Sequence, residues 1–85
     1  MLMVIKPDGN IERLDESKPS LERLQELVGG YVEVVQSPRL PGKWVVLNED
    51  GEPMDLPLNE AATIATGWPH MLRGNVVICN HDDIS

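Results

Sequence analysis

The spacing of apolar residues changes its period at a pair of glycines, Gly29 and Gly30. Before the pair, residues 21–28 place leucine and valine on one face of a helix, and either Ser17 or Ser20 can cap that helix. After the pair, residues 31–36 alternate as a strand does. Either glycine can adopt the left-handed conformation that ends a helix. The pair therefore predicts a helix that folds back across the strand following it.

Other short apolar runs, separated by turn residues, predict further strands. Residues 2–5 and 11–14 flank a Pro-Asp-Gly turn and are expected to form a hairpin. Residues 44–47 form another strong run, and residues 54–58 form a brief edge strand confined by prolines. Residues 75–79 are apolar throughout after Asn75, which is typical of a strand covered on both faces. We expect that strand at the centre of the sheet.

A second, short helix is predicted between Asn59 as its cap and Gly67 as its stop. The element order is then ββαββαβ. The predicted fold class is α+β, a mixed, mostly antiparallel sheet of about five strands with two short helices. We expect residues 1–80 to form a single α+β domain and residues 81–85 to form a short C-terminal tail.

The charge balance limits the class of partner. Seven Lys and Arg residues stand against fourteen Asp and Glu residues, a formal net charge of −7. Such a chain repels duplex nucleic acid and anionic membranes at long range, whereas it can attract a basic protein. Its one cysteine cannot form an intramolecular disulfide, and no apolar run approaches the ~20 residues of a membrane span. We therefore expect a cytoplasmic protein.

The residue types that perform catalysis are sparse. Cys79 lies inside an apolar run, where cysteine is usually an inert small hydrophobe. The carboxylate pairs at residues 49–50 and 82–83 fall in a turn and in the tail, without apolar surroundings to raise a pKa. His81 and its acidic neighbours lack the ligand spacing of a structural zinc site. The sequence predicts no catalytic residues, no metal, no cofactor and no enzymatic activity.

Four motifs in a fixed order resemble a family of small domains from phages, plasmids and other mobile elements. That family is catalogued only as a domain of unknown function. The motifs are LQELVGGYVE (residues 24–33), NEDG (48–51), LPLNEAAT (56–63) and GNVV (74–77). The resemblance implies an accessory protein of a mobile element, located in the host cytoplasm if a phage encodes it. It transfers no catalytic residue. Residues 39–44 and 66–73 depart from the family pattern.

Those two departing segments carry tryptophan beside basic side chains. An aromatic face and a guanidinium group can stack on a nucleotide base and bind its phosphate. The alternative interpretation is that Trp44 and Trp68 fill the core, since the chain has no phenylalanine. Glu33 is likewise either a solvated or salt-bridged sheet residue or part of a binding surface. The candidates for ligand or partner binding are Arg39, Lys43, Trp44, Trp68, His70, Arg73, Tyr31 and Glu33.

Two functional hypotheses follow. The first is a non-enzymatic accessory protein of a phage or mobile element, acting in counter-defence or host takeover by binding and blocking a host protein. An edge strand near Met54 or the acidic face of the first helix would make the contact. The second is sequestration of a nucleotide-like signalling molecule at the Trp/Arg loops. A homo-oligomer would supply the concavity that one small chain lacks.

Overall fold

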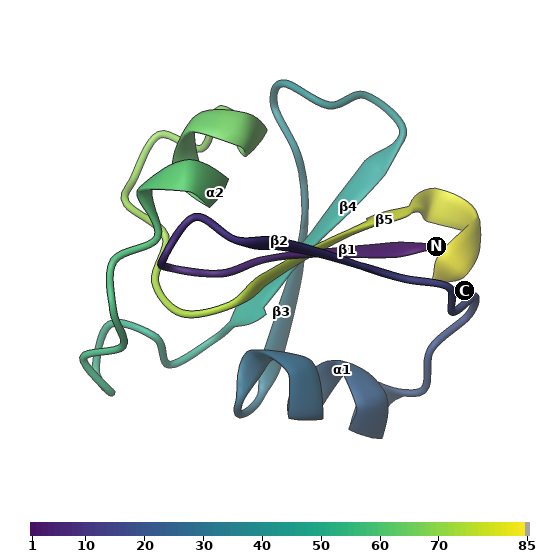
Figure 1. The fold of residues 1–85 in the computed structure, drawn as a ribbon, viewed down its shortest axis with the longest axis horizontal. Helices are drawn as coiled ribbons and strands as arrows, with labels where there is room; N and C mark the ends of the chain where they lie inside the picture. The colour runs from purple at the N-terminus through teal and green to yellow at the C-terminus, as the bar shows by residue number, and fades with distance from the viewer. Residues whose placement is uncertain (85) are drawn as a thin grey trace.

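A computed structural model describes residues 1–84 of the protein (Figure 1). The observed order of strands and helices is ββαββαβ, which confirms the α+β prediction. The elements are β1 (Leu2–Ile5), β2 (Ile11–Leu14), α1 (Leu21–Val28), β3 (Val32–Gln36), β4 (Lys43–Asn48), α2 (Glu60–Thr66), β5 (Val76–Asn80) and the 3-10 helix η1 (His81–Asp83).

The five strands form one sheet in the spatial order β2-β1-β5-β4-β3. We predicted a mostly antiparallel sheet, and every neighbouring pair is antiparallel. The last strand in the chain, β5, is the central one, as its continuous apolar sequence predicted. Ile78 is paired with Met3 of β1 on one side and with Val45 of β4 on the other.

The sheet separates two apolar layers, because successive side chains of a strand point to opposite faces. Figure 1 shows α1 and α2 on opposite sides of the sheet. One cluster of buried side chains packs under α1 and consists of Leu2, Val4, Leu24, Val28, Val46, Val77 and Cys79. The other packs under α2 and consists of Ile5, Val45, Ala62, Leu72, Val76 and Ile78. We call these sides the α1 face and the α2 face.

Helix α1 begins at a serine cap, because the backbone N–H of Arg23 donates to Ser20 Oγ at 3.1 Å. Of the two serines considered, Ser20 is therefore the cap. Leu24 and Val28 are buried against the sheet, as the apolar stripe predicted. Leu21, at the start of the same stripe, is 59% exposed because it lies at the margin of the helix, beside the outer strand β3.

The two glycines after α1 have different structural roles. Gly29 adopts a left-handed conformation with φ of 81°, and its N–H donates to the Gln25 carbonyl at 2.8 Å. Gly30 is needed for space, since a Cβ atom there would lie 2.9 Å from Asn48 Nδ2. That amide nitrogen donates to the Val28 carbonyl at 3.2 Å. The pair thus ends α1 and lets a buried asparagine of β4 hold the helix end.

Helix α2 is bounded by the two residues that the sequence predicted. Asn59 Oδ1 accepts a hydrogen bond from the Ala62 N–H at 3.0 Å, and Gly67 ends the helix with φ of 70°. The same Asn59 side chain donates from Nδ2 to the carbonyls of Ile5 and Gly74, at 2.8 and 2.7 Å. Asn59 is completely buried. It therefore joins the helix to strand β1 and to the segment before β5.

The predicted edge strand at residues 54–58 is wrong in the structure. The chain forms tight turns there, with Met54 N–H donating to Asp50 O and Asp55 N–H donating to Glu52 O, both at 2.9 Å. Asp55 has a positive φ of 51°, which is incompatible with a strand. One isolated bridge remains between Leu58 and Arg73. The prolines and the turn hydrogen bonds together exclude a longer pairing.

The segment predicted as a C-terminal tail packs onto the domain as far as it is described. Asp83 is 8% exposed, and its carboxylate accepts a hydrogen bond from the Asn80 N–H at 3.1 Å. Ile84 packs against the cluster on the α1 face. The last residue of the predicted tail, Ser85, lies outside the described residues.

Candidate functional site

Strand β3 is an outer strand whose backbone is paired only with β4. The Tyr31 carbonyl and the Ser37 N–H, on either side of β3, both form hydrogen bonds with the β4 side of the hairpin, at 2.9 and 3.5 Å. Hydrogen-bonding direction alternates along an antiparallel strand. The N–H and C=O groups of Val32, Val34 and Gln36 therefore point away from β4, toward the open edge of the sheet.

The side chains of this edge are partly apolar, and Glu33 is the one charged residue of β3. Tyr31 is 68% exposed, Val34 is 38% exposed and Glu33 is exposed. Residues 32–36 contain neither lysine nor proline. Lysine, proline and bulges are the usual means of preventing a further strand from pairing with an edge. The β3 edge is thus open to strand addition.

A depression of about 280 Å³ lies beside β3 on the α1 face. Leu21 and Leu24 of α1 line one side of it, while Val32 and Val34 of β3 line another. Ile84 also contributes to its lining. A depression of this kind can accept an apolar side chain from a strand placed next to β3.

Among the predicted site residues, the two tryptophans lie on opposite faces of the sheet. Trp44 packs against the cluster under α1, and its ring lies 4.3 Å from the His81 ring between centroids. Trp68 packs against the cluster under α2. Both are partly buried. The structure therefore does not bring Trp44 and Trp68 into one site.

Two of the predicted basic residues are engaged with neighbouring backbone and side chains. The Arg39 guanidinium donates to the Ile64 carbonyl at 3.2 Å, and the Arg39 N–H donates to the Thr66 carbonyl at 3.1 Å. Arg39 thereby satisfies carbonyl groups at the end of α2. Lys43 donates a hydrogen bond from Nζ to Asn80 Oδ1, across the β4–β5 pair.

Three of the predicted residues, Trp68, His70 and Arg73, do lie around one depression of about 180 Å³. Its lining also includes the acidic residues Glu49 and Glu52. The Arg73 guanidinium already contacts an Asp55 carboxylate oxygen at 3.1 Å and the Leu56 carbonyl at 3.1 Å. The negative charges of Glu49 and Glu52 disfavour phosphate binding in this depression, because like charges repel.

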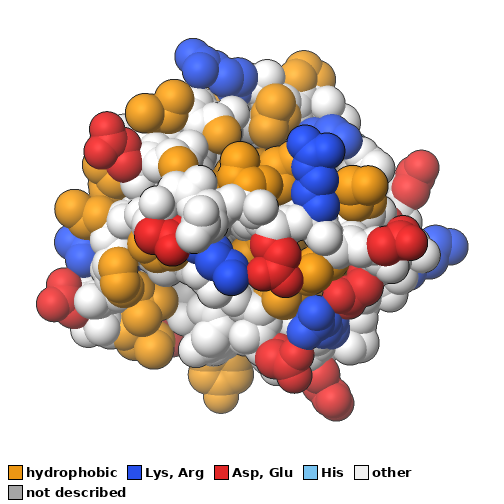
Figure 2. Space-filling model, in the orientation of Figure 1, with side chains coloured by type: hydrophobic (Ala, Val, Ile, Leu, Met, Phe, Trp, Pro, Cys, Tyr) orange, Lys and Arg blue, Asp and Glu red, His pale blue; other side chains and the backbone are white. Residues whose placement is uncertain are grey.

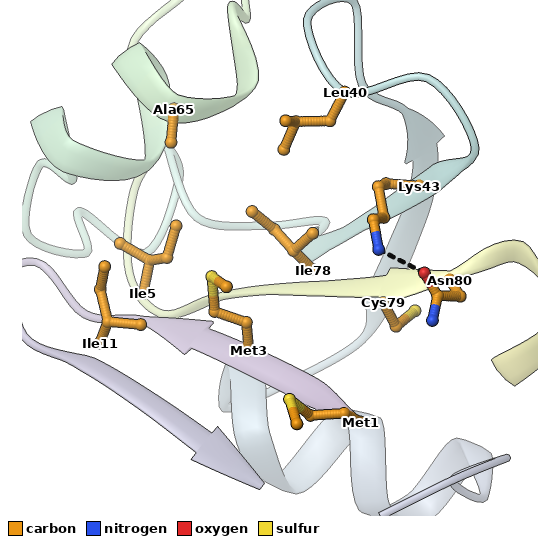
Figure 3. Close-up of a pocket in the computed structure, with 10 residues that line it drawn as sticks. All are labelled: Met1, Met3, Ile5, Ile11, Leu40, Lys43, Ala65, Ile78, Cys79 and Asn80. Carbon is orange, nitrogen blue, oxygen red and sulfur yellow. Dashed lines mark hydrogen bonds between the residues drawn. The ribbon is translucent and has the colours of Figure 1, made fainter.

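A depression of about 550 Å³, larger than the two described above, lies on the α2 face and was missed from the sequence (Figure 3). We call it the apolar groove. Its apolar lining comes from β1, β2, β5, α2 and the β3–β4 loop, namely Met1, Met3, Ile5, Ile11, Leu40, Ala65 and Ile78. Lys43, Cys79 and Asn80 lie at one end of it. In Figure 2 hydrophobic side chains line a hollow below α2, with a basic side chain at its margin.

The groove exists because α2 is short. Its seven residues cover the sheet over Val45 and Val76, whereas Ile11 on the outer strand β2 stays 56% exposed. Alternation along residues 2–5 places Met3 and Ile5 on the same face. That alternation was the one feature of the sequence that pointed to the groove. It did not show which part of the face the helix would leave open.

Cys79 lies in the central strand, and its side chain belongs to the cluster under α1. Burial, together with the negative charge of Asp83, raises the pKa of Cys79 to about 11. The thiol is therefore protonated at neutral pH, which makes it a poor nucleophile. Within residues 1–84, no group of three or more His, Cys, Asp or Glu side chains is arranged to hold a metal ion.

The architecture defines a small α+β domain in which one antiparallel sheet lies between two helices. A family model described as a domain of unknown function, DUF3846, matches residues 1–85, and the chain belongs to that family. No curated protein and no solved structure matches it. None of the helices in residues 1–84 has the length and apolar character needed to cross a membrane.

Proposed function

We propose that this domain is a non-enzymatic accessory protein of a phage, plasmid or other mobile element, and that it binds and blocks a host protein in counter-defence or host takeover. The setting comes from the four ordered motifs and their resemblance to proteins of mobile elements. The binding mode is supported by one observation, the open edge of β3. An extended segment of the host protein pairs with this edge and adds a sixth strand to the sheet.

The backbone of β3 supplies the affinity in this arrangement. Val32, Val34 and Gln36 present unpaired N–H and C=O groups along the open edge, as the alternation from Tyr31 to Ser37 requires. Each new backbone hydrogen bond contributes about 1 kcal/mol net. These bonds fix the register of the partner strand and add to the free energy gained by burying its apolar side chains.

The side chains of β3 supply the specificity. Directly paired residues of antiparallel strands point to the same face. A partner residue opposite Val34 would therefore point toward the depression beside Leu21, whose lining is mostly apolar but includes Lys18 and Asp83. A partner residue opposite Glu33 would meet a carboxylate on the other face. The expected partner strand alternates apolar and basic residues. The net charge of −7 favours the same basic partner at long range.

Selection from a yeast-displayed library of random peptides tests this proposal without knowledge of the host protein. We expect the selected peptides to alternate apolar and basic residues. Val34→Pro removes an N–H of the open edge and leaves the pairing with β4, so peptide binding should fall at least about tenfold. Val34→Thr, which keeps the N–H and the branched shape, is the matched control and should bind normally.

Charge reversal at Glu33 provides the specificity test. Peptides selected with Glu33→Lys should carry acidic residues where those selected with the wild type carry basic ones. The folding of each variant is checked by circular dichroism. Peptides that bind Val34→Pro and the wild type equally well, with both proteins folded, would show that the edge of β3 is not the binding site.

Sequestration of a nucleotide-like signalling molecule receives less support from the geometry. Trp68, His70 and Arg73 share a depression, but Glu49 and Glu52 line it too. This alternative predicts that cyclic or linear nucleotides raise the melting temperature of the wild type and not that of Trp68→Ala. A nucleotide panel without any such shift would contradict it.

A further inference from the structure

We propose that the apolar groove on the α2 face binds a small amphipathic anion, a molecule with an apolar chain and one terminal carboxylate. The chain lies along Met3, Ile5 and Ile78, and the carboxylate binds Lys43. This site is separate from the proposed strand-addition site, since the groove lies over β2, β1 and β5 while β3 is at the other end of the sheet.

The size and lining of the groove fit a small ligand. Its volume of about 550 Å³ lies within the range of small-molecule sites, which hold few polar groups in a mostly apolar wall. The floor consists of sheet residues, and Leu40 and Ala65 form a wall on the side of α2 (Figure 3). The Met1 and Met3 side chains are unbranched and adaptable, so they can fit chains of different shape.

The polar end of the groove determines the sign of the ligand charge. Lys43 is the one charged side chain that lines the groove, and its Nζ donates to the neutral Asn80 amide oxygen. No carboxylate of residues 1–84 lies within ion-pair distance of Lys43. An ammonium group has three donors, so others remain available for an anion. The Asn80 amide can donate to the same carboxylate.

The concavity of the groove and the ammonium group of Lys43 favour a small anionic ligand over a flat macromolecular surface. A carboxylate bound by an ammonium group forms a charge-assisted hydrogen bond, which is stronger than a neutral one. The apolar chain gains free energy by leaving water. A cationic or neutral amphiphile of the same length gains only the second contribution, so the discrimination between head groups measures the role of Lys43.

Dodecanoate, below its critical micelle concentration, is the probe, and methyl NMR of the purified protein is the measurement. We expect saturable shifts at the methyl groups of Met3, Ile5, Ile11 and Ile78. Dodecyltrimethylammonium and 1-dodecanol, with the same chain, should bind at least about tenfold more weakly. Lys43→Gln should weaken dodecanoate binding about tenfold, while Lys43→Arg should retain it.

Two further variants distinguish binding in the groove from non-specific binding of amphiphiles to the protein surface. Lys6→Gln removes a lysine that pairs with Glu12 at 3.0 Å and does not line the groove, so it should leave dodecanoate binding unchanged. Ile11→Ser removes an exposed part of the wall without disturbing the core and should weaken binding of all three amphiphiles.

Several outcomes would overturn the proposal. Equal affinity for the anionic and cationic amphiphiles would show that Lys43 does not select the ligand. Shifts confined to methyl groups outside the groove, or no saturation, would show that the groove is not a site for such anions. A concentration-dependent change of the groove methyl groups without any probe would show that a second copy of the chain covers the groove instead.

Discussion

Asn59 Nδ2 donates a hydrogen bond to the backbone carbonyl of Ile5, at 2.8 Å and across 54 residues of sequence. The same amide also donates to the Gly74 carbonyl, and its oxygen caps α2. One buried side chain therefore fixes the start of a helix relative to β1 and to the entry of β5. Hydrophobic packing is not directional, whereas these three hydrogen bonds specify one position of α2 on the sheet.

Replacing Asn59 should be among the most destabilising single changes. Asn59→Ala loses the cap and leaves two buried carbonyls without their donor, which we expect to lower the free energy of unfolding by about 3 kcal/mol. Asn59→Ser keeps a capping oxygen and loses the amide donors, so it should lose about 2 kcal/mol. Urea unfolding measures both. A serine variant as stable as the wild type would show that the two amide donors contribute little.

The two glycines after α1 should respond differently to substitution. Gly29 has a left-handed conformation and open space around it, so Gly29→Asn should be mild and Gly29→Ala should cost about 1 kcal/mol. Gly30 has no unusual φ, but an added Cβ meets Asn48 Nδ2 at 2.9 Å. Gly30→Ala and Gly30→Asn should therefore both destabilise. Urea unfolding in which Gly30→Asn matches the wild type would contradict the steric role.

Local sequence signals predicted most of this fold. Ser20, Asn59 and Gly67 bound their helices as capping chemistry requires, and the apolar run before Cys79 became the central strand. The failure at residues 54–58 has a specific cause. The sequence showed apolar residues and prolines there, but not the turn hydrogen bonds from Asp50 to Leu56 that exclude a strand.

Cys79 provides a test of burial at the centre of the sheet. Its pKa, raised to about 11, should make native modification by an aromatic disulfide reagent near pH 8 at least about a hundredfold slower than in the unfolded chain. The folded state holds the thiol protonated. Its contribution to stability is therefore present below the ordinary pKa of 9.0 and is lost as the pH rises toward 11.

Cys79→Ala is the matched variant for the pH measurement. It should have a lower free energy of unfolding than the wild type, because alanine lacks the buried sulfur atom of Cys79 and leaves a small cavity. Its stability should decline less steeply than that of the wild type between about pH 9 and 11, because the group that titrates is missing. Identical slopes for the two proteins over that interval would contradict the assignment.

The ion pair between Glu16 and Arg23 should be visible in a carboxyl titration. Arg23 Nη2 lies 2.8 Å from Glu16 Oε2, and this hydrogen bond lowers the pKa of Glu16 below its ordinary value of 4.5. Arg23→Gln should raise that pKa. The small contribution of the pair is present above about pH 4.5 and is lost as the pH falls through the lowered pKa.

Carbon-detected NMR of the side-chain carboxyl group measures the Glu16 titration directly. Arg13→Gln is the matched control, because Arg13 lies on β2 and makes none of the ion pairs found in residues 1–84. It should leave the Glu16 titration unchanged. An equal shift in both variants would indicate a general charge effect.

The candidate sites were harder to predict from the sequence than the fold was. Strand alternation predicts Tyr31 and Glu33 on one face and Val32 on the other. Val32 and Val35 do pack against clusters on opposite faces of the sheet. The position of β3 at the edge depends on the whole strand order, which no local pattern contains. The apolar groove depends on where α2 stops above Ile11 and Met3. The hydrogen-bond partners of Arg39 and Arg73 are set by tertiary packing, which no local sequence pattern contains.

The central place of β5 has a consequence for biosynthesis. The strands made earlier form two hairpins, β1 with β2 and β3 with β4, and β5 is what pairs the first hairpin with the second. On the ribosome, the two hairpins cannot join into one sheet until Asn80 has left the exit tunnel, although α1 can already pack on β3 and β4. The sheet must therefore close late, and a nascent chain arrested before residue 76 should leave the β1–β2 hairpin sensitive to proteases, because a lone two-stranded hairpin is marginally stable.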